Sequence, residues 1–293
     1  MFPFAKVFLL SIAFISSLFG KRDAPKDNFS LPDGISYEVL QYREGDHERA
    51  GQIGIAYKTK KTSDKKLPIV VFIHGGGWSK GDKDGMRYQA IRYAQRGYLA
   101  ATISYRLISE APLPSCILDV KQAIRFLKKS ATKFNGDPER IGVQGYSAGA
   151  HLALLIGLTP EFDKFKSSAY NEFDSTVQCV FAVAGPTDFS TRAEKRGKLK
   201  FLTEEQNNNP LFLKEISPLS YINKGQIPIF IMHGDKDSLV PAYNYQFFNK
   251  KCQEMGVANF ELHEFKEGGH MFFFKHSKKT LPIMDRFFDK SLK

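Results

Sequence analysis

Short, nearly continuous runs of apolar residues recur along the chain, and longer segments between them place apolar residues three or four positions apart. Short apolar runs are typical of strands buried on both faces, whereas the wider spacing indicates amphipathic helices. The runs, with two alternating segments near the start, predict eight strands at residues 35–42, 52–58, 69–74, 98–104, 140–146, 177–184, 229–233 and 260–265.

The segments between these strands carry the helical pattern. Val120, Ile124 and Leu127 lie at helical spacing, and Gly97 stands where a preceding helix should end. Helices are predicted at residues 86–96, 118–129, 148–158, 243–255 and 281–292. Buried strands that alternate with helices require crossover connections. The pattern therefore predicts an α/β fold with a mostly parallel sheet of about eight strands, helices on both faces and an antiparallel pair at the start.

Two long segments interrupt this alternation, at residues 159–176 and 186–221, with polar, aromatic and proline-containing sequence. Insertions of this length after strands often form a cap over a site. The alternative is a plain surface loop. We expect small cap insertions on the domain.

The first part of the chain differs from the rest. Lys6 precedes an apolar run at residues 7–19, which a glycine and two basic residues end. This run is shorter than the roughly 20 residues that a membrane-spanning helix needs, and it fits the apolar region of a secretory signal peptide. We interpret residues 1–20 as a signal peptide, 21–34 as a leader and 35–293 as one domain. This interpretation predicts a secreted or periplasmic protein without a stable membrane span in its mature form. An uncleaved anchor and an N-terminal core helix are the alternatives.

The composition is that of a globular protein with excess positive charge, 42% hydrophobic, 25% charged and formally +11. The densest basic stretch, residues 58–66, lies between two predicted strands and lacks the interleaved aromatic residues of a nucleic-acid-binding surface. We read it as a solvated turn and expect no nucleic-acid partner. The cysteines Cys116, Cys179 and Cys252 form neither a disulfide framework nor a metal-ligand pattern, although a Cys116–Cys252 disulfide stays open. The sequence leaves the oligomeric state open.

The strongest chemical motif is Gly145-Tyr146-Ser147-Ala148-Gly149, at the junction of a predicted strand and a predicted helix. A sharp turn there holds a serine hydroxyl clear of the sheet, at the positive end of the helix. Glycines on both sides leave room for the neighbouring backbone. Ser147 is therefore the candidate nucleophile, and Tyr146 is a tentative substrate-binding residue.

A second motif, HGGGW at residues 74–78, follows a predicted buried strand. Consecutive glycines let backbone N–H groups approach a substrate, and such donors stabilise the oxyanion of an acyl-transfer intermediate. We expect Gly76, Gly77 and Ala148 to supply this oxyanion hole. A phosphate-binding loop would need Lys followed by Ser or Thr, which this motif lacks. Trp78 is a tentative substrate-binding residue or a wedge that fixes the loop, and the motif's histidine is expected to be structural.

A serine nucleophile at a strand-to-helix turn needs a general base and an acid that orients it, and we expect both in loops after later strands, in the order acid and then histidine. The segment HGDKDSLVP at residues 233–241 offers two aspartates. We choose Asp237 as the acid because it lies deeper in the loop, and Asp235 is expected to shape the turn. His270 follows two glycines after the last strand and is the candidate general base. Asp237 would then hold its tautomer.

The motifs HGGGW, GYSAGAHLALL, HGDKDSLVP and GGH together resemble those of α/β-hydrolases, in the hormone-sensitive-lipase-like and acetyl or feruloyl esterase branches. The likeness runs from about residue 35 to the C-terminus. It implies the α/β-hydrolase fold and carboxylesterase activity with no metal or organic cofactor. It also implies a catalytic triad of Ser147, Asp237 and His270. The implied partner is a small-molecule or carbohydrate-linked ester substrate.

Two departures bear on the substrate. Only a short leader precedes the first predicted strand, where hormone-sensitive-lipase-like enzymes carry a large helical cap, and residues 108–112 replace their usual Pro-Glu. With the predicted signal peptide, these features favour removal of acetyl or feruloyl groups from plant polysaccharide side chains. Two other functions stay open: a kynurenine formamidase-like amide hydrolase, which shares HGG-x-W and the run at residues 147–151, and a non-catalytic binding protein on the same fold.

Overall fold

The computed structural model describes residues 30–45, 47–60, 65–160, 163–165, 169–191 and 198–293. The chain divides into two units after Asp33, and the second, Gly34–Lys293, carries the sheet and the described helices. The predicted signal peptide lies outside the described residues.

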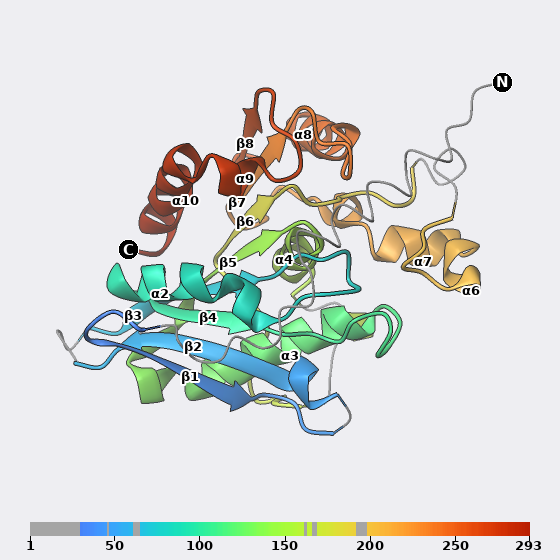
Figure 1. Ribbon diagram of the computed structural model, residues 1–293. Helices are drawn as coiled ribbons and strands as arrows, with labels where there is room; N and C mark the ends of the chain where they lie inside the picture. The colour runs from blue at the N-terminus through green and yellow to red at the C-terminus, as the bar shows by residue number, and fades with distance from the viewer. Residues whose placement is uncertain (1–29, 46, 61–64, 161–162, 166–168, 192–197) are drawn as a thin grey trace. The chain divides into compact units, whose positions relative to one another are not determined.

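The second unit is built on one sheet of eight strands in the order β1-β2-β4-β3-β5-β6-β7-β8 (Figure 1). β2 pairs antiparallel with both β1 and β4, and every later pairing is parallel, which confirms the predicted class. The strands are β1 (Ile35–Gln41), β2 (Gln52–Lys58), β3 (Leu67–Ile73), β4 (Leu99–Ile103), β5 (Gly136–Tyr146), β6 (Cys179–Val183), β7 (Ile229–Gly234) and β8 (Phe260–Phe265).

The five predicted helices lie close to their predicted positions, and the short helices α6, α7 and α9 were not predicted. The described helices are α2 (Arg87–Gln95), α3 (Ser115–Ser130), α4 (Ala148–Leu158), α6 (Glu204–Asn207), α7 (Pro210–Glu215), α8 (Tyr243–Met255), α9 (Phe272–Lys275) and α10 (Ser277–Leu292), with 3-10 turns η1 (Glu48–Gly51), η2 (Lys83–Met86), η3 (Ala131–Phe134), η4 (Asp163–Phe165) and η5 (Pro218–Tyr221). Gly97 adopts a φ of +86°, a conformation suited to ending a helix. Three predicted starts were too late: α3 begins at Ser115, β5 at Gly136 and α10 at Ser277.

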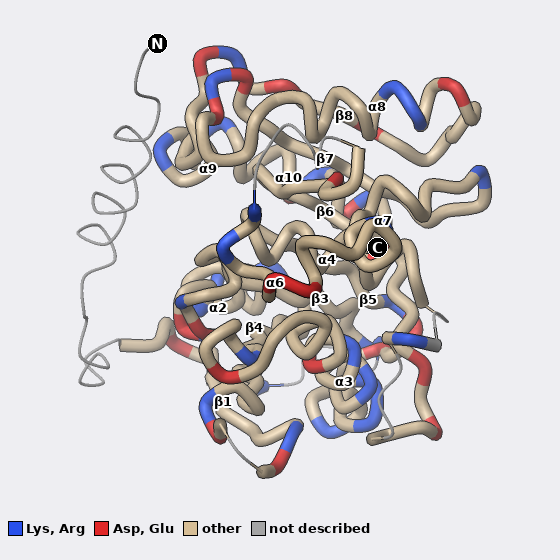
Figure 2. The backbone as a smooth tube through the Cα atoms, turned by 90° about the vertical axis from the view of Figure 1, so that its right-hand side faces the viewer, with Lys and Arg blue, Asp and Glu red and all other residues tan. Residues whose placement is uncertain are grey.

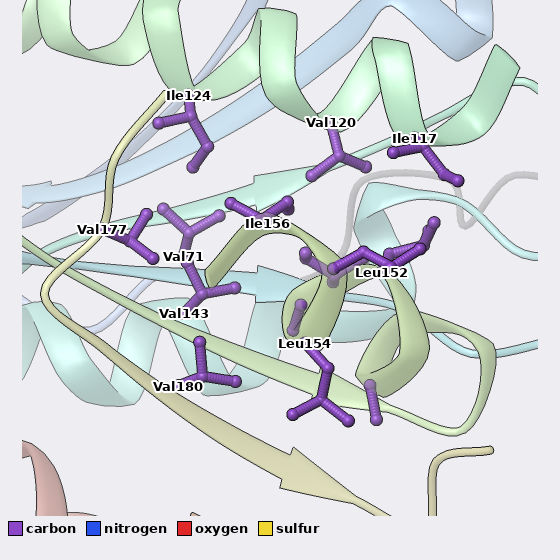
Figure 3. Close-up of a cluster of buried hydrophobic side chains, with 14 of the residues drawn as sticks. Val71, Ile117, Val120, Ile124, Val143, Leu152, Leu154, Ile156, Val177 and Val180 are labelled. Atoms are coloured by element: carbon purple, nitrogen blue, oxygen red, sulfur yellow. The ribbon is translucent and has the colours of Figure 1, made fainter. Parts of the chain in front are cut away.

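Each face of the sheet is covered by helices, as the alternation of side chains along β5 illustrates. A Cβ on Gly142 would lie 2.7 Å from the Phe288 ring of α10, whereas the next residue, Val143, points into the cluster formed with α3 and α4 (Figure 3). α2 shares the face of α10, since Arg92 donates two hydrogen bonds to Asp285. The core therefore consists of two apolar layers, one on each side of the parallel strands.

The insertion at residues 186–221 is more than a surface loop. It carries α6, α7 and η5, and α6 begins with a capping box in which Thr203 and Gln206 bond each other's backbone N–H groups. Phe189 and Phe201 from this segment pack against Trp78, with ring centroids 6.0 and 4.1 Å away. The insertion thus lies over the glycine-rich loop after β3.

Residues 61–64 of the basic stretch lie outside the described residues. Figure 2 shows basic and acidic positions distributed over many segments instead of collected on one. The three cysteines are buried and free, so the Cys116–Cys252 disulfide that the sequence left open is not formed. None of the helices in the described parts of the chain is long and apolar enough to cross a membrane.

Candidate active site

Ser147 occupies the sharp turn between β5 and α4. Its φ of +55° and ψ of −119° lie in a region that side chains rarely adopt, and its N–H is held by the Val183 carbonyl at 2.8 Å. The turn depends on its flanking glycines: a Cβ on Gly145 would lie 2.1 Å from the Gly149 carbonyl oxygen, and one on Gly149 2.2 Å from the Ile73 carbonyl oxygen. The motif's glycines therefore serve close backbone approach.

The structure brings Ser147, His270 and Asp237 into one hydrogen-bonded row. His270 Nε2 lies 3.0 Å from Ser147 Oγ, and His270 Nδ1 lies 2.7 Å from Asp237 Oδ2. The three residues follow β5, β8 and β7, whose carboxyl ends share one edge of the parallel sheet. The serine and the imidazole are partly exposed, whereas Asp237 is 5% exposed.

Asp237 is held on both sides. Its Oδ1 accepts the N–H groups of Leu239 and Val240, each at 2.9 Å, and Oδ2 faces His270. The bonds to Oδ1 close the turn, a task that the sequence analysis gave to Asp235. The Oδ1 of Asp235 is buried and lacks a hydrogen-bond partner among the described residues. The choice of Asp237 as the residue facing the imidazole agrees with this geometry.

The glycine-rich loop after β3 lies beside the serine. A Cβ on Gly75 would come within 3.1 Å of the Ser147 Cβ. Gly76 and Gly77 have φ values of +115° and +59°. A Cβ on Gly76 would also clash with the Lys80 carbonyl oxygen at 2.0 Å. The loop conformation is therefore available to glycine and to few other residues.

Trp78 and Tyr146, the tentative substrate contacts, are 5% and 6% exposed. The Trp78 ring is enclosed by His151, Phe189 and Phe201. This packing matches the wedge role that the sequence analysis gave as its alternative. The Tyr146 hydroxyl donates to the carbonyl oxygen of His270 at 2.7 Å. Both rings therefore support the loops of the site and leave little surface for a ligand.

His74 is structural, as expected. Its ring stacks on Tyr105, with centroids 4.2 Å apart and planes 6° from parallel, and its Nδ1 lies 2.7 Å from the Gly75 carbonyl oxygen. Burial lowers the pKa of His74 to about 4. His151 was not predicted to have a role. Its Nε2 lies 2.7 Å from the Ile216 carbonyl oxygen, and burial lowers its pKa to about 4 as well.

These two buried imidazoles predict a loss of stability in mild acid. In the unfolded chain they take up protons near pH 6.5, whereas in the folded protein they resist protonation until about pH 4. Stability is therefore complete above pH 6.5 and should fall between there and pH 4, by about 1.4 kcal/mol per pH unit for each histidine. Urea unfolding at pH 7 and pH 5 measures it. His151→Gln should reduce the slope, and an equal free energy of unfolding at both pH values would contradict the expectation.

The fold and the order of Ser147, Asp237 and His270, each placed after a parallel strand, define a class of protein, the α/β-hydrolases. Within that class, the BD-FAE family model matches residues 56–252, and the chain belongs to the BD-FAE family.

Individual relatives agree with this placement. "Esterase LipQ" of Mycobacterium tuberculosis (strain ATCC 25618 / H37Rv) is 28% identical over 216 residues, which cover 71% of this chain and 51% of the relative. "Esterase LipC" of the same organism is 27% identical over 259 residues, covering 83% and 64%. The chain thus spans about half to two thirds of the length of these relatives.

Solved structures share the fold. The butyrate-bound esterase Est2 of Thermogutta terrifontis superposes with a TM-score of 0.74 at 25% identity, over 88% of this chain and 94% of that chain. A truncated carbohydrate esterase from gut microbiota superposes with a TM-score of 0.75 at 22% identity, over 87% and 96% of the two chains.

Proposed function

We propose that the protein is a serine carboxylesterase in which Ser147, His270 and Asp237 form the catalytic triad. The observation that carries the proposal is the continuous row from Asp237 through His270 to Ser147, with distances of 2.7 and 3.0 Å. Esterase relatives support the same reaction class.

The geometry supplies each step of acyl transfer. Ser147 Oγ attacks the ester carbonyl carbon while His270 Nε2 takes its proton. The tetrahedral intermediate collapses as the carbon–oxygen bond to the alcohol breaks, and His270 returns the proton to the departing oxygen. Water then attacks the acyl-enzyme by the same route and releases the acid. Asp237 accepts a hydrogen bond from Nδ1–H throughout, which keeps Nε2 free to receive the serine proton.

The oxyanion of each intermediate needs donors near Ser147. We assign this role to the backbone N–H groups of Gly76, Gly77 and Ala148. The close approach of Gly75 to the Ser147 side chain supports the assignment, because the loop then lies beside the carbonyl that Ser147 would attack. The N-terminus of α4 adds the positive end of its dipole at the same point.

The substrate proposed is an ester with a short or aryl acyl group, such as acetyl or feruloyl, carried by a plant polysaccharide side chain. Binding of butyrate and of propionate by Thermogutta terrifontis esterase 2 supports a short acyl group. A structure described as a bifunctional GH43-CE protein of Bacteroides eggerthii, 25% identical over 90% of this chain and 39% of that chain, supports a carbohydrate-linked substrate. A secreted or periplasmic location is part of this proposal.

Hydrolysis of p-nitrophenyl esters tests the reaction class. We expect purified protein to cleave p-nitrophenyl acetate and butyrate, and acetylated and feruloylated xylo-oligosaccharides then test the natural substrate. Activity on N-formylkynurenine with none on any ester would replace the proposal with the amide-hydrolase reading. A well-folded protein inactive on both would favour the binding-protein reading.

The Tyr146 hydroxyl is expected to contribute to catalysis by holding the His270 loop. Tyr146→Phe removes the 2.7 Å hydrogen bond to the His270 carbonyl oxygen, and one neutral hydrogen bond corresponds to a fall in kcat of about three- to tenfold. KM should change little. Tyr98→Phe, which removes a hydroxyl bonded to Asp289 on α10, is the control and should retain kcat. An unchanged kcat in Tyr146→Phe would show that the loop needs no such brace.

A further inference from the structure

A second imidazole faces the acid of the proposed triad. His233 is fully buried at the end of β7, and its Nε2 lies 3.5 Å from Asp237 Oδ2, the oxygen that also faces His270 Nδ1. Both histidines therefore lie beside the same carboxylate oxygen, His270 in a hydrogen bond and His233 at a longer distance. Nothing in the esterase mechanism above uses His233.

The tautomer of His233 follows from its contacts. Its Nε2 lies 2.9 Å from the Val240 carbonyl oxygen, which can only accept a hydrogen bond, so Nε2 carries the proton. Nδ1 is buried without a hydrogen-bond partner among the described residues. A proton on Nδ1 would leave a charged group with an unmet donor in the core, which is costly. Burial accordingly lowers the pKa of His233, and the ring stays neutral.

The position of this ring is rigid. His233 is the next-to-last residue of β7, whose register pairs it with Glu264 on β8, and the Tyr245 ring of α8 lies 4.9 Å from its ring, centroid to centroid. Beside it, Gly234 approaches the Gly268 backbone so closely that a Cβ would lie 2.0 Å from the Gly268 carbonyl oxygen. The ring is thus held at the point where the Asp237 loop and the His270 loop meet.

We infer that His233 is a positioning residue for the acid: its Nε2 proton, donated to the Val240 carbonyl, fixes the turn that carries Asp237, and its ring, 3.5 Å from Asp237 Oδ2, keeps that oxygen aimed at His270. Because the His233 ring is neutral, it orients the Asp237 carboxylate but does not compete as a cation. The carboxylate stays available to pair with His270 when that ring receives the serine proton. The inference deepens the proposed esterase function and rests on it. Both backbone polar groups of Val240 are hydrogen-bonded within the turn: its carbonyl accepts from His233 Nε2, and its N–H donates to Asp237 Oδ1 at 2.9 Å.

The test compares three variants. Glutamine can place an amide N–H near the position of Nε2, whereas asparagine is too short to reach the Val240 carbonyl and leucine has no donor. We expect His233→Leu and His233→Asn to lower kcat by about tenfold with KM nearly unchanged. His233→Gln should recover most of that loss. The control for lost stability alone is Lys128→Met on α3. It removes a buried donor to Asp174 and Thr176 and should keep kcat.

A second readout does not depend on turnover. The proton on His270 Nδ1, in its short bond to Asp237, is expected to give a far-downfield NMR signal, which should persist in His233→Gln and shift or broaden in His233→Asn and His233→Leu. Wild-type kcat and an unchanged signal in the folded His233→Asn variant would overturn the inference. A wild-type protein inactive on every ester would instead overturn the proposed function, and the NMR comparison would still decide whether His233 orders the carboxylate.

Discussion

Ser147→Ala is expected to lower kcat for p-nitrophenyl acetate by about 10⁴-fold or more, because the variant lacks the hydroxyl that attacks the carbonyl in the proposed mechanism. The fold should be retained, since alanine carries the same Cβ as serine and adds no backbone strain, and the change removes only the hydroxyl that meets His270 at 3.0 Å. Residual turnover would come from the oxyanion donors alone. Stopped-flow and steady-state assays on both proteins measure the loss.

A labelling experiment separates loss of the nucleophile from loss of binding. A fluorophosphonate should add its mass to the peptide that contains Ser147 in the wild type, and should leave Ser147→Ala unmodified. Ser130→Ala, at the end of α3, is the matched control and should react like the wild type. Full activity in Ser147→Ala, or a label on another residue, would contradict the assignment of the nucleophile.

Asp237→Asn is expected to lower kcat by about 10³- to 10⁴-fold with the fold intact. The reason lies in the turn. The N–H groups of Leu239 and Val240 both point at Oδ1, so an asparagine must place its oxygen there and turn its NH₂ toward His270. Nδ1 of His270 then has to accept, the proton moves to Nε2, and the ring cannot receive the serine proton.

Asp235→Asn is the matched control, two residues away on the same loop. Its Oδ1 lacks a hydrogen-bond partner among the described residues, so the variant should keep kcat close to that of the wild type. The pair is measured under identical conditions with p-nitrophenyl acetate. The reverse ranking, with Asp235→Asn inactive and Asp237→Asn active, would exchange the roles of the two aspartates.

Local patterns in the sequence were enough to predict the eight strands, five of the helices and the class of fold. Apolar and alternating runs predicted the strands, and α4 and α8 were predicted with the observed bounds. These signals are local because a strand buried on both faces must be apolar throughout. The errors fall at element starts. α10 begins before Pro282 although proline favours a first turn, and β5 gains its first residues by pairing Gly136 with Leu67 across the sheet.

The motifs also determined which residues were candidates for chemistry, because a tight turn and a close backbone approach restrict the choice to glycine. Gly145 and Gly149 around Ser147, and the glycines after β3, carry this signal. A single sequence is enough to show this need for glycine, because a side chain at these positions would overlap backbone atoms.

Only the tertiary structure decided how those candidates meet. Packing between segments far apart in the chain places β4 between β2 and β3 in the sheet and brings three distant loops together at one edge. The same packing buries Trp78 and Tyr146. The role of His233 belongs here as well, since a buried histidine carries no local signal. Its contact with Asp237 exists because the turn at Val240 folds back over β7. The sequence by itself determined the elements and the chemical groups, whereas long-range packing set the distances between them.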